Sequence, residues 1–405
     1  MQTTVKIPIS KLKLGMYIQE DVISENGILL FCADTFITNP TQIQRLKNQG
    51  VRDVSINVNK NANQLNQPKN QKTTAHSKSL YSGPLICFKH DIYQAQAVIY
   101  KSILLFKKCM DSLLKDINLS VEGVNCIAQT IVEEVIARRD ALLLVCRMQI
   151  KDDPLYAHSV SVCATSAALA YSLNLSRNDI VKCATGAILH DIGMLEISQN
   201  ILKKNVNLTK TEYSELQKHP GLGAGIIEKT GRFPEIVKTI VMQHHERWNG
   251  GGYPNRLKKD AIEHFSMICS VSDIYDSLTR NSEHKRACLP QEAMALIFQG
   301  ANQDYPRYIV EAFTRLMGIY PVGSFVKLTT GEIGLVVKNR PKSLMTPSTI
   351  ICFNPRDGKL KRPFYRDLYP VSSTAVQQLW KIESTVEPQK LGMSIHSVIS
   401  SATQN

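Results

Sequence analysis

The sequence predicts a multidomain protein with three parts of different texture: a small α+β unit, a long helical region and a small β-rich module. Apolar residues alternate in short runs near the N-terminus and recur at helical spacing through the middle of the chain. After Tyr320-Pro321 they return to short runs broken by Gly, Pro and Asp-Gly, which is typical of strands and turns. A length of 405 residues accommodates two or three such domains.

The N-terminal part, residues 1–60, is expected to be a small α+β regulatory domain. Apolar residues alternate from Val5 to Ile9 as in a half-buried strand. Asn26-Gly27 between two apolar runs indicates a hairpin turn, and Asn39-Pro40 is typical of a helix start. Gly50 is expected to end that helix, before a further strand. No catalytic constellation is visible in this part.

The remaining segments follow from changes of composition. A flexible polar linker is predicted for residues 61–88 and a helical connector for residues 89–150. Residues 151–318 form the domain that carries the histidines described below. A β-rich module is predicted for residues 319–381 and a tail of little pattern for residues 382–405. The connector is a candidate surface for a homodimer or a signalling protein.

The composition limits the compartment and the partners. No apolar run approaches the roughly 20 residues of a membrane helix, and the N-terminus lacks the apolar core of a signal peptide. Ten scattered cysteines without C-x-x-C spacing suit buried thiols in a reducing compartment, so we expect a cytoplasmic protein without membrane insertion. The net charge of +13 is spread along the chain, which favours phosphate-bearing small ligands over a nucleic acid polymer.

Residues 158–273 hold an unusual concentration of histidine and aspartate. Six of the ten histidines of the chain fall there, and five of them, with two of the aspartates of this stretch, are candidate ligands, namely His158, His190, His219, His244, His245, Asp191 and Asp273. Any one of these histidines alone is more often a hydrogen-bonded core or surface residue. As a set in an otherwise histidine-poor chain, imidazole and carboxylate side chains favour a site for Fe, Mn, Zn or Ni.

Helical periodicity predicts that these side chains converge. The apolar stripe of residues 236–241 continues at a spacing of four onto His244 and His245, so the pair points inward. The stripe through Phe265 and Cys269 reaches Asp273 in the same way. A carboxylate on a buried stripe is costly unless it is paired or bound to a metal. Asp191 follows His190 at a helix end, which suits a carboxylate that bridges two metals.

These stretches resemble the HD-GYP family, a subgroup of the HD-superfamily metal phosphohydrolases associated with cyclic di-GMP hydrolysis. The matching segments are Y-A-H-S-V-S-V, A-I-L-H-D-I-G-M-L, L-T-K-T-E-Y-S-E-L-Q-K-H-P-G-L-G, H-H-E-R-W-N-G-G-G-Y-P and S-V-S-D-I-Y-D-S-L-T. They cover residues 151–318 in the family's order. The segment I-S-K-L-K-L-G-M-Y-I resembles the small domain of unknown function that often precedes such domains.

The resemblance implies an all-α catalytic domain with two or three divalent metal ions, usually iron or manganese. It implies the ligand set His158, His190, Asp191, His219, His244, His245 and Asp273, with His190 and Asp191 as catalytic residues. Asp191 would be the bridging carboxylate. An acidic residue shortly before the first histidine supports a third metal in some members, and Asp153 is the nearest candidate here.

The chain departs from the family at the rim of the site. Met194 stands where the family has a phosphate-associated lysine, Asn249 replaces an acid, and Ser282 replaces an arginine. Lys285 remains as a candidate phosphate contact, and Arg280 and Arg286 lie close enough in sequence to compensate. By resemblance, Tyr253 helps to shape the base or ribose pocket, behind a lip formed by the glycines at 250–252.

Metal ions at such a site make a bridging water acidic and neutralise phosphate charge, so phosphodiester hydrolysis needs no protein nucleophile. Three functions stay open at this point. The first is hydrolysis of cyclic di-GMP to linear pGpG or onward to GMP. The second is a catalytically weak regulator that binds a cyclic dinucleotide, a reading motivated by the lost lysine and arginine. The third is a phosphodiesterase for cyclic GMP-AMP.

Overall fold

The computed structural model describes residues 4–13, 16–18, 20, 22–23, 29–31, 35–36, 40–57, 82–115, 119–148, 153–202, 204, 208–281, 287–369 and 380–403. The chain divides into two compact units, Met1–His90 and Asp91–Asn405, and each is described by itself. The predicted linker and the Asn26-Gly27 turn fall mostly or wholly outside the described residues.

The first unit is an antiparallel sheet with one helix, as the N-terminal sequence predicts. Its sheet has the order β1-β6-β2-β5, with β3 and β4 as a separate pair. The elements are β1 (Thr4–Pro8), η1 (Ile9–Lys11), β2 (Tyr17–Ile18), β3 (Val22–Ile23), β4 (Leu29–Phe31), β5 (Thr35–Phe36), α1 (Pro40–Asn48) and β6 (Asp53–Asn57). Leu46 of α1 packs with Ile18, Val54 and Ile56 of the sheet, so alternation along the strands and periodicity along the helix build one small core.

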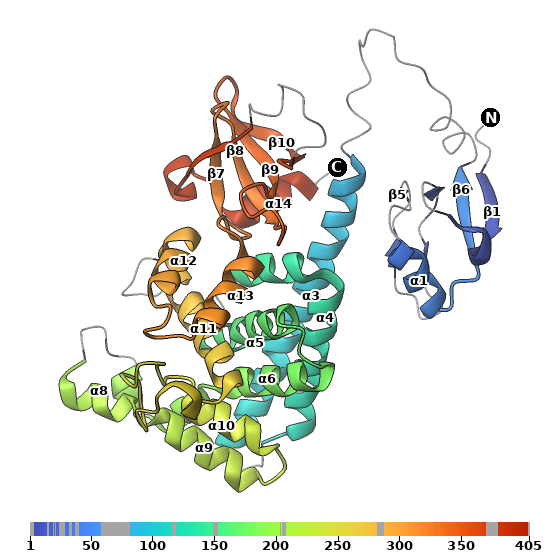
Figure 1. The fold of residues 1–405 in the computed structure, drawn as a ribbon. Helices are drawn as coiled ribbons and strands as arrows, with labels where there is room; N and C mark the ends of the chain where they lie inside the picture. Colours follow the sequence, from blue (N-terminus) through green and yellow to red (C-terminus); the bar gives the residue numbers. More distant parts are fainter. Residues whose placement is uncertain are drawn as a thin grey trace. The chain divides into compact units, whose positions relative to one another are not determined.

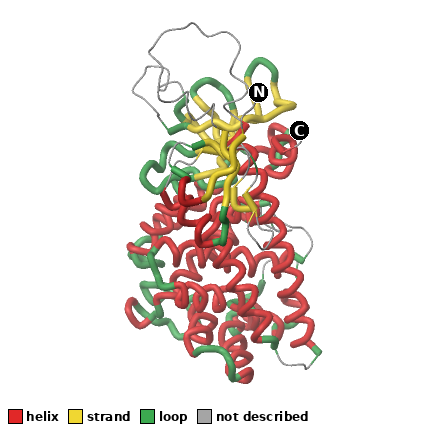
Figure 2. Tube along the Cα trace, turned by 90° about the vertical axis from the view of Figure 1, so that its right-hand side faces the viewer, coloured by secondary structure: helices red, strands yellow, loops and turns green. Residues whose placement is uncertain are grey.

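The second unit is dominated by helices, which gather into one body with a five-stranded sheet at one end (Figures 1 and 2). Its helices are α3 (Ser82–Leu114) from Asp91 onward, α4 (Val121–Arg147), α5 (Pro154–Ser172), α6 (Arg177–Leu189), η2 (Ile192–Glu196), α7 (Gln199–Leu202), α8 (Lys210–Leu216), α9 (His219–Thr230), α10 (Glu235–Gln243), η3 (Lys259–Ala261), α11 (His264–Thr279), α12 (Pro290–Gln299) and α13 (Arg307–Met317).

Helix α5 lies at the centre of this body and packs against α4, α6, α11 and α13. It is buried on nearly every side because its sequence is rich in Ala, Ser and Val, whose small side chains let neighbouring helices approach closely. Val162 of α5, Ala187 of α6, Ile240 of α10 and Cys269 of α11 meet in one cluster. The helices that end in the predicted ligands therefore share one core, and their ends come together beside it.

The C-terminal part of the second unit is an antiparallel sheet of order β10-β9-β8-β7-β11. Its elements are β7 (Phe325–Leu328), β8 (Ile333–Lys338), β9 (Ser348–Asn354), β10 (Gly358–Asp367), β11 (Ile382–Thr385), η5 (Pro388–Leu391) and α14 (Ile395–Thr403). Residues 382–405 are predicted to be a tail of little pattern, and this prediction is wrong for the described part: β11 pairs with β7, and α14 packs on β9 and β10. The short length of β11 explains why periodicity did not reveal it.

The predicted fold class is confirmed: in chain order, a helical HD-type domain follows an N-terminal α+β unit and precedes a β-rich C-terminal module. Within the part of the chain that the structure describes, no helix combines the length and apolar character needed to cross a membrane.

Candidate metal centre

Three histidines are oriented by backbone carbonyl groups at the ends of helices. The Nδ1 atom of His190 lies 2.7 Å from the Ala187 carbonyl oxygen, and His219 and His244 make the same contact three residues back, at 2.8 and 2.7 Å. A carbonyl oxygen accepts only, so each Nδ1 carries the proton and each Nε2 presents a lone pair. His190, His219 and His244 are buried. The Nε2 donor atoms of these three histidines therefore lie in the interior of the domain.

The predicted ligands form two groups that meet at Asp191. One group is Asp191, His219, His244 and His245, and the other is His158, His190 and Asp273. Asp191 Oδ1 lies 3.4 Å from His219 Nε2 and 3.7 Å from His244 Nε2. Its Oδ2 lies 3.3 Å from His190 Nε2 and 3.8 Å from His158 Nε2. Each carboxylate oxygen thus faces a different group, which is the placement of a bridging ligand.

His158 is held from behind by a second carboxylate. Its Nε2 lies 3.2 Å from Asp273 Oδ1, while its Nδ1 lies 2.7 Å from Asp276 Oδ2. Arg280 Nε donates to the same Asp276 oxygen at 2.8 Å, and Arg280 Nη2 bonds Ser161 Oγ at 3.2 Å. Asp276 and Arg280 therefore orient the imidazole of His158, in the carboxylate–histidine arrangement that supports metal ligands.

Local electrostatics keep the carboxylates ionised. Burial opposes charge on Asp191, but His190 and the other imidazoles hold its pKa well below the ordinary value. Burial lowers the pKa of His219 to about 4 and that of His245 well below its usual range. Burial also disfavours the charged form of His158, yet Asp273 and Asp276 raise its pKa to about 10. The ionised carboxylates and the neutral imidazoles of His219 and His245 form a donor set suited to a cation, and the carboxylates around His158 favour positive charge at the same place.

Two observations test whether these residues fit metal ions. The Nε2 atom of His190 is buried and has no hydrogen-bond partner among the described residues. The Nε2 atoms of His219 and His244 lie 3.2 Å apart, although the Nδ1 atoms of both rings already donate to carbonyls. Two lone pairs that face each other at this distance repel unless a cation lies between them. The donor set fits divalent metal ions.

Close backbone approach requires glycine at two positions around the centre. A Cβ atom on Gly193 would lie 2.0 Å from the His219 carbonyl oxygen. One on Gly252 would lie 2.4 Å from the Arg247 backbone nitrogen and 2.5 Å from the His245 carbonyl oxygen. The glycine-rich loop therefore folds directly onto the histidine pair. Its Tyr253 ring stacks on His245, with ring centroids 4.6 Å apart.

Glu246 positions the loop beside the histidine pair and is not among the predicted site residues. It is fully buried, and its two carboxylate oxygens accept hydrogen bonds from the backbone nitrogens of Asn255 at 2.7 Å and Leu257 at 3.0 Å. These bonds fix the loop that follows Tyr253. The signal was present in the sequence, since an acid directly after a buried histidine pair needs partners.

The other predicted site residues lie in different surroundings. Asp153 is the N-cap residue of α5, and its two oxygens each accept from Lys107 Nζ at 3.0 Å, so it belongs to neither histidine–aspartate group. Arg280 is directed to Asp276 rather than into an open pocket. Ser282, Lys285 and Arg286 lie outside the described residues.

Of the two remaining rim positions, Met194 lies half-buried in η2, directly after the glycine that packs on His219. Asn249 Oδ1 accepts from the Gly251 backbone nitrogen at 2.7 Å, so its amide shapes the glycine-rich loop.

A cavity of about 710 Å³ opens beside the first group. Its walls are formed by the glycine-rich loop and by residues just before and at the start of α9. The lining residues are Ser214, Gln217, Lys218, Gly221, Leu222, Gly250, Gly251, Gly252, Tyr253, Pro254 and Arg256. Tyr253, which stacks on His245, forms part of its wall. The cavity is within the size range of small-molecule sites.

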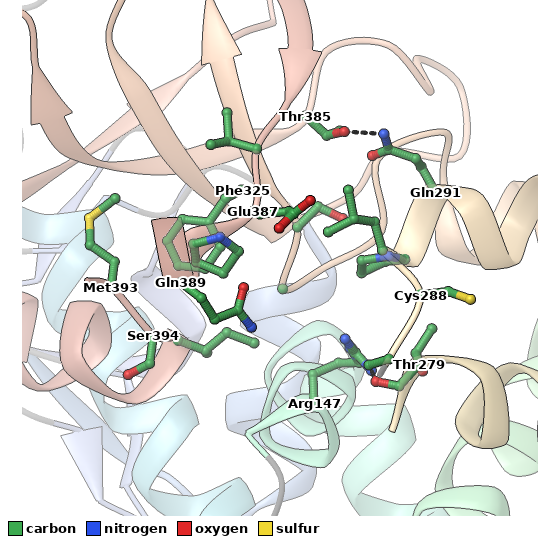
Figure 3. A pocket seen from close by; sticks show the side chains of 18 of the residues that line it. Arg147, Thr279, Cys288, Gln291, Phe325, Thr385, Glu387, Gln389, Met393 and Ser394 are labelled. Atoms are coloured by element: carbon green, nitrogen blue, oxygen red, sulfur yellow. Dashed lines mark hydrogen bonds between the residues drawn. The ribbon is translucent and has the colours of Figure 1, made fainter. Parts of the chain in front are cut away.

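A second cavity, of about 510 Å³, lies between the ends of α4 and α11 and the C-terminal sheet (Figure 3). Arg147 donates to the Thr279 carbonyl at 2.7 Å there, and the Gln291 amide bonds the Thr385 hydroxyl. None of its described lining residues belongs to either histidine–aspartate group. It is separate from the metal centre.

Comparisons with known proteins place both parts of the chain. An HD domain matches residues 145–308, and a domain of unknown function (DUF3391) matches residues 4–120, well beyond the predicted 1–60 unit. A cyclic di-GMP phosphodiesterase of Pseudomonas aeruginosa is 28% identical over 362 residues, which cover 87% of this chain and 86% of that protein.

Two Vibrio cholerae proteins match over shorter stretches. A cyclic di-GMP phosphodiesterase is 34% identical over 35% of this chain and 30% of its own length. A 3'3'-cGAMP-specific phosphodiesterase is 28% identical over 51% of this chain and 40% of its own length. The HD domain, the preceding DUF3391 domain and the two histidine–aspartate groups that share Asp191 agree with the resemblance to the HD-GYP family drawn from the motifs.

Proposed function

We propose that this chain is a metal-dependent phosphodiesterase that hydrolyses cyclic di-GMP to linear pGpG, with GMP as the product of a second cleavage. The observation that carries the proposal is the pair of donor groups that share Asp191, because a shared carboxylate would hold two cations close together, as phosphodiester hydrolysis by two metal ions needs. The Pseudomonas aeruginosa relative, which is named a cyclic di-GMP phosphodiesterase, spans nearly the whole chain and supports this substrate.

The two donor groups would hold two divalent ions, with iron or manganese proposed because histidine and carboxylate ligands suit both. Such ions supply an acidic bound water and positive charge for the phosphate oxygens. The protein residues orient this chemistry. Asp191 holds the two groups at a fixed spacing, and the helix-end carbonyls fix the tautomers of His190, His219 and His244. A third ion at Asp153 is less well supported, since that carboxylate bonds Lys107.

A specific observation supports each of two alternative functions. The loss of a basic residue at Met194 favours a weak hydrolase whose output is a protein contact. The similarity to a Vibrio cholerae phosphodiesterase named as specific for 3'3'-cGAMP favours that substrate instead. The nine cysteines in the described part are free thiols, which supports the cytoplasm, where such nucleotides and reduced thiols occur together.

The proposal is tested on protein purified without oxygen. Bound metal is measured first, and turnover of cyclic di-GMP and 3'3'-cGAMP is then followed by chromatography. We expect about two metal ions per chain, cleavage of cyclic di-GMP to pGpG, and loss of both metal and turnover in Asp191→Ala. Full metal content without turnover would reject the enzyme and favour the regulator. Faster cleavage of 3'3'-cGAMP would reassign the substrate, and turnover that persists in Asp191→Ala would reject the site.

A further inference from the structure

The cavity beside the first donor group is lined by positively charged side chains. Among the described residues that line it, Lys218 and Arg256 are cationic and none is acidic. Lys218 directly precedes the ligand His219, and Arg256 follows the loop that carries Tyr253. We propose that these two cations bind the phosphate of the cyclic dinucleotide that lies away from the metal centre, which replaces part of the charge lost at Met194. This inference rests on the proposed function.

The backbone at Arg256 is held in an unfavourable conformation. Its φ is 55°, a left-handed value that glycine adopts readily and a long side chain rarely does. The neighbouring backbone nitrogens of Asn255 and Leu257 both donate to the buried Glu246, which prevents the loop from relaxing. An exposed arginine at such a position contributes little to folding. Strain maintained by a buried carboxylate is typical of a side chain retained for binding.

Lys218 is available to a ligand although it has a partner. Its Nζ lies 2.6 Å from Glu215 Oε2, but the two side chains are 60% and 45% exposed. An exposed ion pair of this kind contributes little, so the ammonium can move to a phosphate at small cost. Gly221, one turn into α9, leaves open space at its Cβ position, so the wall between Lys218 and the loop is accessible.

The geometry suits a ligand with two phosphate groups. The phosphate that is cleaved must lie at the donor groups around Asp191, so the rest of the ring extends past Tyr253. The cavity there has about 710 Å³, room for a nucleoside unit and the second phosphate. Arginine offers a planar fork and lysine a point charge, and both bind phosphate oxygens without reading the base. We therefore expect a clamp that accepts guanine and adenine dinucleotides alike.

The test uses the metal-loaded full chain and measures kcat, KM and, by calorimetry, the Kd of cyclic di-GMP, 3'3'-cGAMP and cyclic di-AMP. Lys218→Met and Arg256→Gln should each raise KM and Kd about five- to tenfold for every ligand that binds, with kcat nearly unchanged. Both losses should shrink as salt concentration rises. Lys229→Met, on the same helix but outside the cavity, is the matched control and should change neither constant.

Arg256→Gly separates binding from folding. Glycine relieves the left-handed strain, so the Tm should rise while ligand affinity falls. Affinities unchanged in Lys218→Met and Arg256→Gln would overturn the clamp, and so would a loss confined to the guanine-containing ligands, which would indicate base recognition. If the wild type binds a ligand but does not hydrolyse it, only the proposed hydrolase is rejected. The Kd values of the variants, measured by calorimetry, still test the clamp. A wild-type protein that binds none of the three ligands would overturn both.

Discussion

Replacing Asp276 by asparagine tests whether the carboxylate behind His158 supports the metal centre. In the structure its Oδ2 atom lies 2.7 Å from His158 Nδ1 and 2.8 Å from Arg280 Nε. Asparagine keeps the shape of the side chain but removes its charge. The imidazole then loses the negative charge that increases its basicity, and the amide fixes its tautomer less strongly than the carboxylate does.

The expected loss is in metal affinity rather than in folding. Removing an outer carboxylate of this kind weakens metal binding by about 10- to 100-fold, or roughly 1.4–2.7 kcal/mol. The substitution also removes the charge that pairs with Arg280, which lowers the unfolding free energy. This loss stays below the roughly 3–5 kcal/mol of removing one partner of a buried ion pair, because the amide oxygen still accepts one hydrogen bond. The protein should therefore fold.

Metal affinity is measured by competition with a chelator, and circular dichroism confirms that each variant is folded. Asp260→Asn, an exposed carboxylate in η3, is the matched control and should leave affinity unchanged. Arg280→Met should resemble Asp276→Asn but lose less, because it acts through one more bond. An Asp276→Asn protein that retains wild-type metal affinity would show that the hydrogen bond at His158 is merely structural.

Three further outcomes follow from the packing around the centre. Gly193→Ala should lower the unfolding free energy by about 2 kcal/mol or more, seen as a lower midpoint in urea, because its Cβ would collide with the His219 carbonyl oxygen. Glu246→Ala should lower it by roughly 2–4 kcal/mol and make the loop sensitive to protease, because two backbone N–H groups lose their acceptor; equal protease resistance would contradict this. Hydrogen bonds from Lys204 and Thr209 lower the pKa of Glu212 to about 2 from an ordinary value of 4.5. Its stabilising effect is complete above about pH 4.5 and is lost as the pH falls towards 2, so the Tm difference between wild type and Glu212→Gln should disappear over that interval.

Sequence periodicity predicted which side chains converge, because convergence follows from helix faces that share one core. The stripes ending at His244 and Asp273 are local properties, and the packing of α5 with its neighbours brings their ends together. The partners behind the ligands could not be predicted in this way. His158 and Asp276 are separated by 118 residues, and only the crossing of α5 and α11 makes them neighbours. For the same reason Arg280 was interpreted as a phosphate contact, although its guanidinium bonds Asp276.

The ligands of the metal centre are constrained by core packing, whereas the rim residues are exposed. This difference explains why the chain departs from the family motifs only at the rim. His190 and His244 are buried and fixed by carbonyls of their own helices, so a change there disturbs the core as well as the donor set. Lys218 and Arg256 carry exposed side chains, so their substitution alters charge with little effect on packing. A cation lost at Met194 can therefore be replaced from another element without rebuilding the centre. Substrate preference within this fold is expected to vary at these rim positions while the metal site stays intact.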